Sequence, residues 1–344
     1  MSLKRFMKAG IMGLPDYVPG EYREGYIKLA SNENNFGPSP KVTEALRALS
    51  DKTHLYPYRT EEVREKVARY VGVGKDNIIL GNGSDELMDM LVKVYKGPVA
   101  GSYPTFSEYP IVAGAVGAKY VEVKLEDDFT FDGRKFLKKA GKSKLLFLCS
   151  PNNPTGLSIP DDELMPVLDS GKIVVLDEAY FEFSDKTRVK LLADYENLII
   201  LRTLSKAFAL AGLRVGYAVA GEGVTRAMLK VKIPFNVSSF AEAAAIAALD
   251  DIPYATRCVE RIVAGRERVY SALSKRFRPL KSDSNFVYAD VSPMTAQGFF
   301  DKLIGKRIIV RKFGRFRGFG GEYVRVSPGT EEETEAFAAA IDSI

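Results

Sequence analysis

Short apolar runs alternate with helical patterns between residues 78 and 220, and this alternation limits the possible folds more than any other feature of the chain. Runs such as KIVVL at 172–176 and NLIIL at 197–201 lack the polar residue at every second position that a half-exposed strand shows. Strands of that kind are buried on both faces, which is typical of a mostly parallel sheet with helices on either side. We therefore predict an open α/β fold for this part of the chain.

The pattern changes after residue 220, where longer helical segments replace the alternation. The sequence predicts helices at 238–250 and 253–276, strands near 285–290 and 323–327, and a terminal helix capped by Thr330. These elements indicate a smaller α+β domain at the C-terminus, joined by the N-terminal segment. We expect a large domain over residues 31–270 and a small domain over 1–30 and 271–344.

Composition argues against several classes of function. No apolar run reaches the roughly 20 residues of a membrane span, and the N-terminal stretch lacks a secretory signal, so we expect a soluble, cytoplasmic protein without a membrane partner. The net charge of +5 comes from Lys and Arg spread along most of the chain, so no nucleic-acid partner is expected. His54 is the sole histidine, and Cys149 and Cys258 are the only cysteines, so we expect neither a metal site nor a disulfide framework.

Polar motifs follow four of the apolar runs, at the points where the predicted strands end. They are GNGSDE at 81–86, SPNNPTG at 150–156, DEAY at 177–180 and TLSK at 203–206. Ligands of open α/β sheets collect at the carboxyl ends of the strands. Taken singly, the first two motifs are more typical of ordinary turns, although the N–H groups of GNGSDE would suit a phosphate. Together the four motifs indicate one binding site.

Asp177 and Lys206 carry the chemistry of that site. Asp177 ends a run that should be buried, and a buried carboxylate is costly unless a cation or a hydrogen-bond donor pairs with it. A lysine taken alone is typical of the surface, but Lys206 follows the next buried run, where loss of hydration would lower the pKa of its amine as Schiff-base chemistry requires. An acid, an amine and a phosphate-type turn at one sheet edge describe a pocket for pyridoxal phosphate.

Five motifs in order along nearly the whole chain resemble the signature of fold-type I, pyridoxal-phosphate-dependent aminotransferases, and most of all the histidinol-phosphate aminotransferases. They are LASNENNFGPSP, GNGSDE, CSPNNPTG, VVLDEAYFEF and LRTLSKAFALAGLRVGYA. The resemblance implies a large domain with a mostly parallel mixed sheet flanked by helices, and a small α+β domain. It implies exchange of an amino group between histidinol phosphate and 2-oxoglutarate through a Lys206 Schiff base, in histidine biosynthesis. The alternatives are an aromatic or broad-range amino acid aminotransferase, or a decarboxylase acting on a threonine-phosphate-like substrate.

The resemblance also implies roles for single residues around the cofactor. Lys206 would form the Schiff base and shuttle a proton, and Asp177 would keep the ring nitrogen protonated. Asn153 and Tyr180 would hydrogen-bond the 3′ oxygen, with Tyr180 counted among the catalytic residues, and Phe106 would stack on the ring. The phosphate would be bound by backbone N–H groups, hydroxyls and a guanidinium, those of Ser84, Asp85, Thr203, Ser205 and Arg214.

Contacts with substrate and with a second subunit follow from the same resemblance. Arg325 matches the arginine that binds the acidic group of the substrate, and further candidates for substrate contact are Arg311, Asn32 and Tyr17. Tyr56 matches a residue that reaches the cofactor phosphate of the other subunit, which implies a homodimer.

The chain departs from the family pattern at three places around the substrate. Asn35 stands where proline usually follows Asn-Glu-Asn, Phe106 where tyrosine is frequent, and Ser327 opens a Ser-Pro-Gly in place of Thr-Val/Ile-Gly. The segment 306–326 is also unusual, because seven Lys or Arg stand there against Glu322 alone. We favour a solvated surface loop for residues 311–323, with steering of an anionic substrate or binding of single-stranded nucleic acid as alternatives.

A ligand-sensing regulator that keeps the aminotransferase fold is the alternative from another class of protein. Such a regulator needs a nucleic-acid module, and the signature motifs begin by residue 29, which leaves no room ahead of them for a helix-turn-helix. We therefore expect an enzyme.

Overall fold

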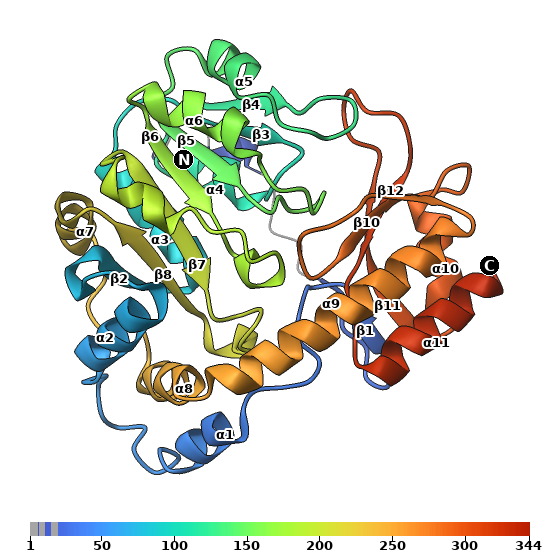
Figure 1. Cartoon of the computed structure of the whole chain (residues 1–344), viewed down its shortest axis with the longest axis horizontal. Coiled ribbons are helices and arrows are strands. Elements are labelled where there is room, and N and C mark those ends of the chain that lie inside the picture. Colours follow the sequence, from blue (N-terminus) through green and yellow to red (C-terminus); the bar gives the residue numbers. More distant parts are fainter. Residues whose placement is uncertain (1–5, 7–10, 15–19) are drawn as a thin grey trace.

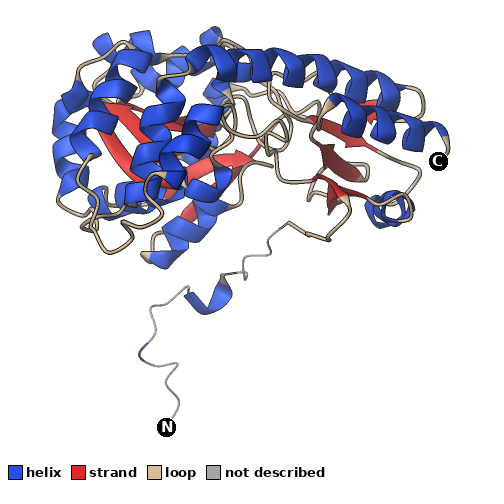
Figure 2. Cartoon of the chain, turned by 90° about the horizontal axis from the view of Figure 1, so that it is seen from below, coloured by secondary structure: helices blue, strands red, loops and turns tan. Residues whose placement is uncertain are grey.

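The computed structural model describes residue 6 and residues 11–14 and 20–344 of the chain. In this described part, helices pack around two separate sheets (Figures 1 and 2). The larger sheet contains, in spatial order, β2 (Ile78–Asn82), β8 (Val215–Ala220), β7 (Leu198–Thr203), β6 (Ile173–Asp177), β5 (Leu145–Cys149), β3 (Val99–Tyr103) and β4 (Tyr120–Lys124). Among these described strands β8 alone runs antiparallel to its neighbours, so the predicted mostly parallel sheet is confirmed.

Both faces of the larger sheet are buried. On β5, Leu146 and Leu148 point into one core, while Leu145 and Phe147 point into another. The first core is covered by α2 (Thr60–Val71), α5 (Gly133–Ala140), α6 (Asp161–Asp169) and α8 (Ser239–Leu249). The second is covered by α3 (Gly83–Val94), α4 (Glu108–Ala115) and α7 (Glu222–Leu229). Because neither face meets water, the central strands need no polar residue at alternate positions.

The smaller sheet joins the two ends of the chain. Its strands, in spatial order, are β1 (Ile27–Leu29), β11 (Ile308–Gly314), β12 (Tyr323–Val326), β10 (Val287–Asp290) and β9 (Arg278–Pro279). It packs with α10 (Ala296–Ile304) and α11 (Glu331–Asp342) around a core of its own. Thr330 caps α11 in a capping box with Glu333, as the sequence predicts. The domain boundaries at residues 30 and 270 stay a prediction.

Helix α9 (Ile252–Ser274) runs from the helices beside the larger sheet to the smaller sheet (Figure 1). Ala255 and Ile262, in its first half, belong to the core of the larger sheet. Val269 and Leu273, in its second half, belong to the core of the smaller sheet. One helix therefore contributes side chains to the first core of the larger sheet and to the core of the smaller sheet.

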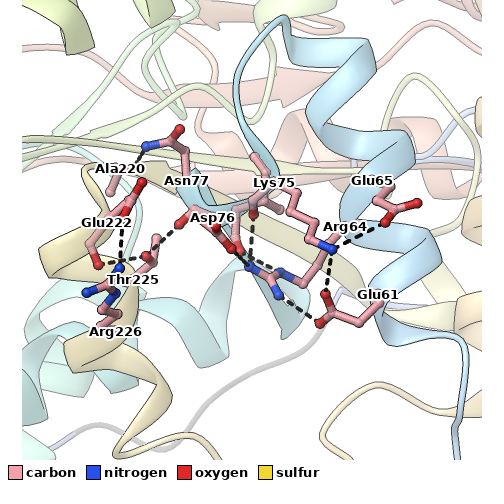
Figure 3. Close-up of polar contacts among 11 residues, drawn as sticks. Glu61, Arg64, Glu65, Lys75, Asp76, Asn77, Ala220, Glu222, Thr225 and Arg226 are labelled. Carbon is pink, nitrogen blue, oxygen red and sulfur yellow. Dashed lines mark hydrogen bonds and ion pairs between the residues drawn. The ribbon is translucent and has the colours of Figure 1, made fainter.

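A polar network fixes the start of β2 (Figure 3). The guanidinium of Arg64 in α2 donates to the carbonyl oxygens of Ile78 at 3.0 Å and Lys75 at 2.9 Å. Thr225 of α7 donates to the carbonyl oxygen of Asp76 at 2.7 Å. These contacts hold η3 (Lys75–Asn77) and β2 in place, and the other end of β2 leads into the GNGSDE turn.

The remaining elements are short. They are α1 (Pro40–Arg47) and the 3-10 helices η2 (Ile11–Gly13), η4 (Phe181–Phe183), η5 (Val189–Ala193) and η6 (Ala211–Leu213).

Candidate active site

A cavity of about 720 Å³ lies between the carboxyl ends of β5, β6 and β7 and the strands β11 and β12. Its wall contains the predicted site residues Asn32, Ser84, Asp85, Phe106, Asn153, Asp177, Tyr180, Thr203, Ser205, Lys206, Arg214, Arg311 and Arg325. Tyr56 is not part of this wall and is 73% exposed. Tyr17 lies outside the described residues. Motifs far apart in the sequence thus meet because parallel strands end at the same edge of the sheet.

Asp177 is the last residue of β6 and is only 3% exposed. Its Oδ2 accepts a hydrogen bond from the hydroxyl of Tyr109 at 2.8 Å, and its Oδ1 accepts one from the backbone N–H of Ala179 at 3.1 Å. Burial raises the pKa of Asp177 to about 6, and the two donors oppose that rise. The carboxylate therefore lies in the cavity wall with two neutral partners, a setting that favours a cation beside it.

Lys206 follows β7 and lies partly buried in the cavity wall. Its Nζ donates to the carbonyl oxygen of Ser31 at 3.3 Å. Burial, and after it the positive charge of Arg325, lower the pKa of Lys206 to about 8. A larger fraction of this amine is neutral near pH 7 than of an exposed lysine, and the neutral amine is the nucleophile.

A corner rich in hydrogen-bond donors lies where α3 begins. The N–H groups of its first turn have no partner within the helix, and the guanidinium of Arg214 lies beside that turn, paired with the Asp85 carboxylate at 2.6 Å. Thr203 and Ser205 supply hydroxyls 2.9 Å apart. Helix N-termini and guanidinium groups both favour a phosphate.

Gly216 on β8 makes this corner possible. A Cβ at residue 216 would lie 2.4 Å from the carbonyl carbon of Gly83 and from the amide nitrogen of Ser84. The first turn of α3 can therefore pack on β8 only when residue 216 has no side chain. The sequence motif LRVGYA places this glycine two residues after Arg214.

Amides and hydroxyls join the end of β6 to the smaller sheet. The hydroxyl of Tyr180 accepts from Nδ2 of Asn32 at 2.9 Å and from Nδ2 of Asn153 at 3.4 Å. Arg325, on β12, donates to Oδ1 of Asn153 and to the carbonyl oxygen of Ala30. Predicted cofactor residues and predicted substrate residues therefore form one hydrogen-bond network.

Arg311 and Arg325 face each other as partners on the antiparallel strands β11 and β12. Both line the cavity, and Arg325 is 7% exposed. The ring of Phe313 lies beside both guanidinium groups, at 5.9 Å from that of Arg311 and 5.7 Å from that of Arg325. Two cations on neighbouring strands repel each other, and an anion between them would relieve the repulsion.

We favoured a solvated loop for residues 311–323. In the structure the first half of this segment is instead part of a strand and of the cavity wall. Strand β11 continues to Gly314, and Phe313 and Phe316 line the cavity together with Arg311. Phe316 packs against Tyr103, Tyr288 and Tyr323, which explains why the segment folds inward. The sequence of this segment does not indicate the inward packing, because its arginines and glycines together outnumber its phenylalanines.

Two further residues of the site were missed by the sequence analysis. Tyr109 bonds Asp177 without lining the cavity, and Cys149 lines it as the strand partner of Asp177. The signal for Tyr109 was only its place three positions after the candidate Phe106, because Phe106 lies before α4 and does not share a helical face with it. Cys149 could be placed at the site only from the register of β5 against β6, in which it is the partner of Asp177.

The three departures from the family pattern have local structural explanations. Asn35 donates to Oε2 of Glu333 at 2.7 Å, the same oxygen that completes the cap of α11. Ser327 donates to Oδ1 of Asn32 at 3.0 Å. Phe106 lines the cavity as an aromatic ring without a hydroxyl.

Two wider properties concern the described residues only. No group of His, Cys, Asp and Glu side chains in that part of the chain is arranged to hold a metal ion. None of its helices is long and apolar enough to cross a membrane.

Comparisons with known proteins agree on one family. The model of the family "Aminotransferase class I and II" matches residues 24–341. A histidinol-phosphate aminotransferase of Methanosarcina barkeri is 37% identical over 361 residues, covering 100% of this chain and 98% of that protein. The crystal structure of the histidinol-phosphate aminotransferase from Sinorhizobium meliloti in complex with pyridoxal-5′-phosphate has a TM-score of 0.89 and 28% identity, over 98% of both chains. L-threonine-O-3-phosphate decarboxylase from Porphyromonas gingivalis, with 20% identity, a TM-score of 0.80 and coverage of 92% and 98%, shares the fold.

Proposed function

Because the chain belongs to the class I and II aminotransferases, we propose that it transfers the amino group of histidinol phosphate to 2-oxoglutarate. The enzyme is a pyridoxal-phosphate-dependent aminotransferase of fold type I. One observation carries the proposed substrate: the arginine pair Arg311 and Arg325 lines the same cavity as Lys206. The full-length likeness to a histidinol-phosphate aminotransferase supports it. On the same likeness we place the enzyme in histidine biosynthesis.

The residues of the cavity fit pyridoxal phosphate. The buried carboxylate of Asp177 has two neutral donors and suits a protonated ring nitrogen. Phe106 offers an aromatic face, and the hydroxyl of Tyr180 with the amide of Asn153 suits the ring oxygen. The first turn of α3 and Arg214 suit a phosphate dianion, and the remaining polar contacts would come from Ser84, Asp85, Thr203 and Ser205.

The chain's own groups divide the chemistry among them. When bound, the cofactor supplies an aldehyde that reacts with amines and a ring that withdraws electrons from the reacting carbon. Lys206 would provide the amine that holds the cofactor and the base that accepts the proton from the amino-bearing carbon of the substrate. Its lowered pKa, about 8, suits both roles. Asp177, ionised above about pH 6, would keep a proton on the ring nitrogen.

The arginine pair sets which substrates bind. A phosphate dianion can accept charge-assisted hydrogen bonds from two guanidinium groups at once. Histidinol phosphate offers a phosphate to Arg311 and Arg325, and 2-oxoglutarate offers its distal carboxylate to the same pair in the second half of the reaction. Asn32 lines the same cavity and donates to the hydroxyl of Tyr180, so it would lie between the cofactor and the substrate.

An aromatic amino acid is the second candidate donor, because Phe313 and Phe316 add two aromatic rings to the cavity wall. The decarboxylase alternative rests on a shared fold alone.

The experiment that separates these donors is a single-turnover screen of the purified holoenzyme. Histidinol phosphate, phenylalanine, tyrosine, aspartate and glutamate are mixed with it in turn, and the change in cofactor absorbance is followed. We expect histidinol phosphate to react fastest, and Arg311→Gln to slow it by about tenfold or more while phenylalanine is less affected. If an aromatic amino acid reacts faster than histidinol phosphate, the proposed substrate is wrong. A Lys206→Ala protein with full activity would contradict the mechanism.

We further propose a homodimer in the cytoplasm. Large apolar side chains stand exposed on one part of the surface, and the ring of Tyr56 stacks on that of Phe235 with centroids 4.4 Å apart. We call this group the aromatic patch, and its members are Leu55, Tyr56, Tyr58, Ile233 and Phe235. A second copy of the chain would cover it and receive Tyr56 at its cofactor phosphate. The buried free thiols of Cys149 and Cys258 suit a reducing compartment.

A further inference from the structure

Tyr109 has a position that the reaction as described does not use. It lies in the first turn of α4 and is 0% exposed. Its ring stacks on Phe147 of β5, with centroids 4.9 Å apart and planes 5° apart, and meets the edge of Phe106 at 5.7 Å. Its hydroxyl donates to Oδ2 of Asp177 at 2.8 Å. The side chain is thus held by packing on two sides, and its polar end points at the one carboxylate that ends β6.

The hydroxyl of Tyr109 acts as a permanent donor. Burial raises its pKa well above the usual value for tyrosine, so the proton stays on the oxygen throughout the working range of an enzyme. Asp177 has one other donor, the backbone N–H of Ala179 at 3.1 Å, and that group is fixed by the chain. Tyr109 therefore supplies the side-chain hydrogen bond that this carboxylate accepts.

Among the described residues, no cationic side chain is among the main influences on the pKa of Asp177. Two carboxylates act on it, Asp85 of α3 and Glu178 directly after β6, while Cys149 and Tyr180 stay protonated because burial raises the pKa of each. The charges of these two carboxylates oppose ionisation of Asp177, as does burial. Removal of the Tyr109 hydroxyl would consequently favour the protonated, neutral carboxyl.

We propose that Tyr109 is a positioning residue for the reaction: its hydroxyl keeps the Asp177 carboxylate ionised and aimed into the cavity, and so sets how tightly the cofactor is held. The inference rests on the proposed function, because Asp177 needs a protonated ring nitrogen to act on. Phe106 lines the cavity with its ring, and Tyr109 donates a hydrogen bond to Asp177. One short segment would therefore act on both the ring face and the ring nitrogen of the cofactor.

Equilibrium binding of pyridoxal phosphate to the apoprotein tests this without any catalytic turnover. The dissociation constant is measured between about pH 5 and pH 8.5 for the wild type, Tyr109→Phe and the control Tyr120→Phe. Tyr120 is a half-buried tyrosine of β4 in the larger sheet, and its buried hydroxyl oxygen makes no hydrogen bond in the described part of the chain. We expect wild-type binding to weaken below about pH 6, and in Tyr109→Phe the midpoint to move up by about one pH unit with about tenfold weaker binding at pH 7. Tyr120→Phe should behave as the wild type.

A double-mutant cycle separates positioning from mere packing. In an Asp177→Asn background the side chain at 177 cannot ionise, so Tyr109→Phe should change binding by less than about twofold. A purely structural role would weaken binding by the same factor in both backgrounds, and that result would overturn the inference, as would an unshifted midpoint in Tyr109→Phe. If Tyr109→Phe does not fold, Phe147→Leu, which keeps the hydroxyl and loosens the ring beneath it, should move the midpoint in the same direction. Failure of the wild type itself to bind pyridoxal phosphate would count against the proposed function.

Discussion

Among single residues, Asp177 lowers the free energy of unfolding of the apoprotein at neutral pH. Its pKa rises from 3.8 to about 6 in the folded chain because burial disfavours its charge. Between those values the folded state binds more protons than the unfolded state, so its contribution to stability is present below about pH 4 and is lost as the pH rises to about 6. We expect the free energy of unfolding of the apoprotein to fall relative to that of Asp177→Asn by about 3 kcal/mol over this range.

Urea unfolding of both apoproteins between pH 4 and 7 measures this difference. A gap that stays constant with pH would show that Asp177 is not perturbed in the fold. Saturating pyridoxal phosphate should reverse the order of the two proteins at neutral pH, because a bound cation then compensates the carboxylate.

Gly216 gives a second prediction at this scale. In Gly216→Ala the new Cβ would meet the backbone of Gly83 and Ser84 at 2.4 Å, so the first turn of α3 has to move away from β8. We expect a loss of about 1–3 kcal/mol in stability and weaker binding of pyridoxal phosphate. The matched control is Gly212→Ala, where nothing lies within 4 Å of the added methyl group. Equal cofactor affinity in both variants would show that this packing does not support the phosphate corner.

Among elements, the segment between β11 and β12 joins the smaller sheet to the larger one. The N–H of Arg317 donates to the hydroxyl of Tyr103 at 2.9 Å, and its guanidinium pairs with Glu122 of β4. Phe319 stacks on Phe129 at 4.6 Å. These contacts hold Phe316 in the cavity wall, and the exposed ion pair itself adds little stability.

Phe316→Ala tests this segment. We expect the KM for the amino donor to rise about tenfold, since removal of a packed aromatic ring costs a few kcal/mol at most and opens the wall. The affinity for pyridoxal phosphate should change little, because the proposed cofactor contacts come from α3 and from the ends of β5, β6 and β7. Steady-state kinetics and cofactor titration measure the two effects, with Arg315→Ala, at an exposed side chain paired with Glu322, as the control. An unchanged KM would show that Phe316 does not meet the substrate.

The site residues at the strand ends could be predicted from the sequence, whereas those of the segment between β11 and β12 could not. Asp177 and Lys206 each follow an apolar run, and the end of a buried strand is already a site-forming position. Phe316 reaches the cavity because of rings that lie far away in the sequence, such as Tyr103 and Tyr288. The bond of Tyr109 to Asp177 likewise spans 68 residues and depends on how α4 packs on β5. Local patterns give no distances of that kind.

For the whole molecule, the aromatic patch predicts the assembly. Phe235→Glu places a charge against Tyr56 and should convert a dimer to a monomer with loss of activity, because Tyr56 would no longer reach the other subunit. Phe235→Tyr keeps the stacked ring and should remain dimeric. Sedimentation velocity at several concentrations distinguishes the two states. A wild type that sediments as a monomer at all concentrations would contradict the proposed homodimer.

Helix α9 has a consequence for how the molecule comes apart. Ala255 and Ile262 belong to one core, and Val269 and Leu273 belong to the other, on a single helix. If either of these two cores unfolds, half of α9 loses its packing, and the other core depends on the same helix. Thermal unfolding should therefore be cooperative across both sheets. In calorimetry the apoprotein should show one heat-absorption peak for both sheets, and two separated peaks would contradict this coupling. A molecule with two sheets, each with its own packing, would then have one melting temperature.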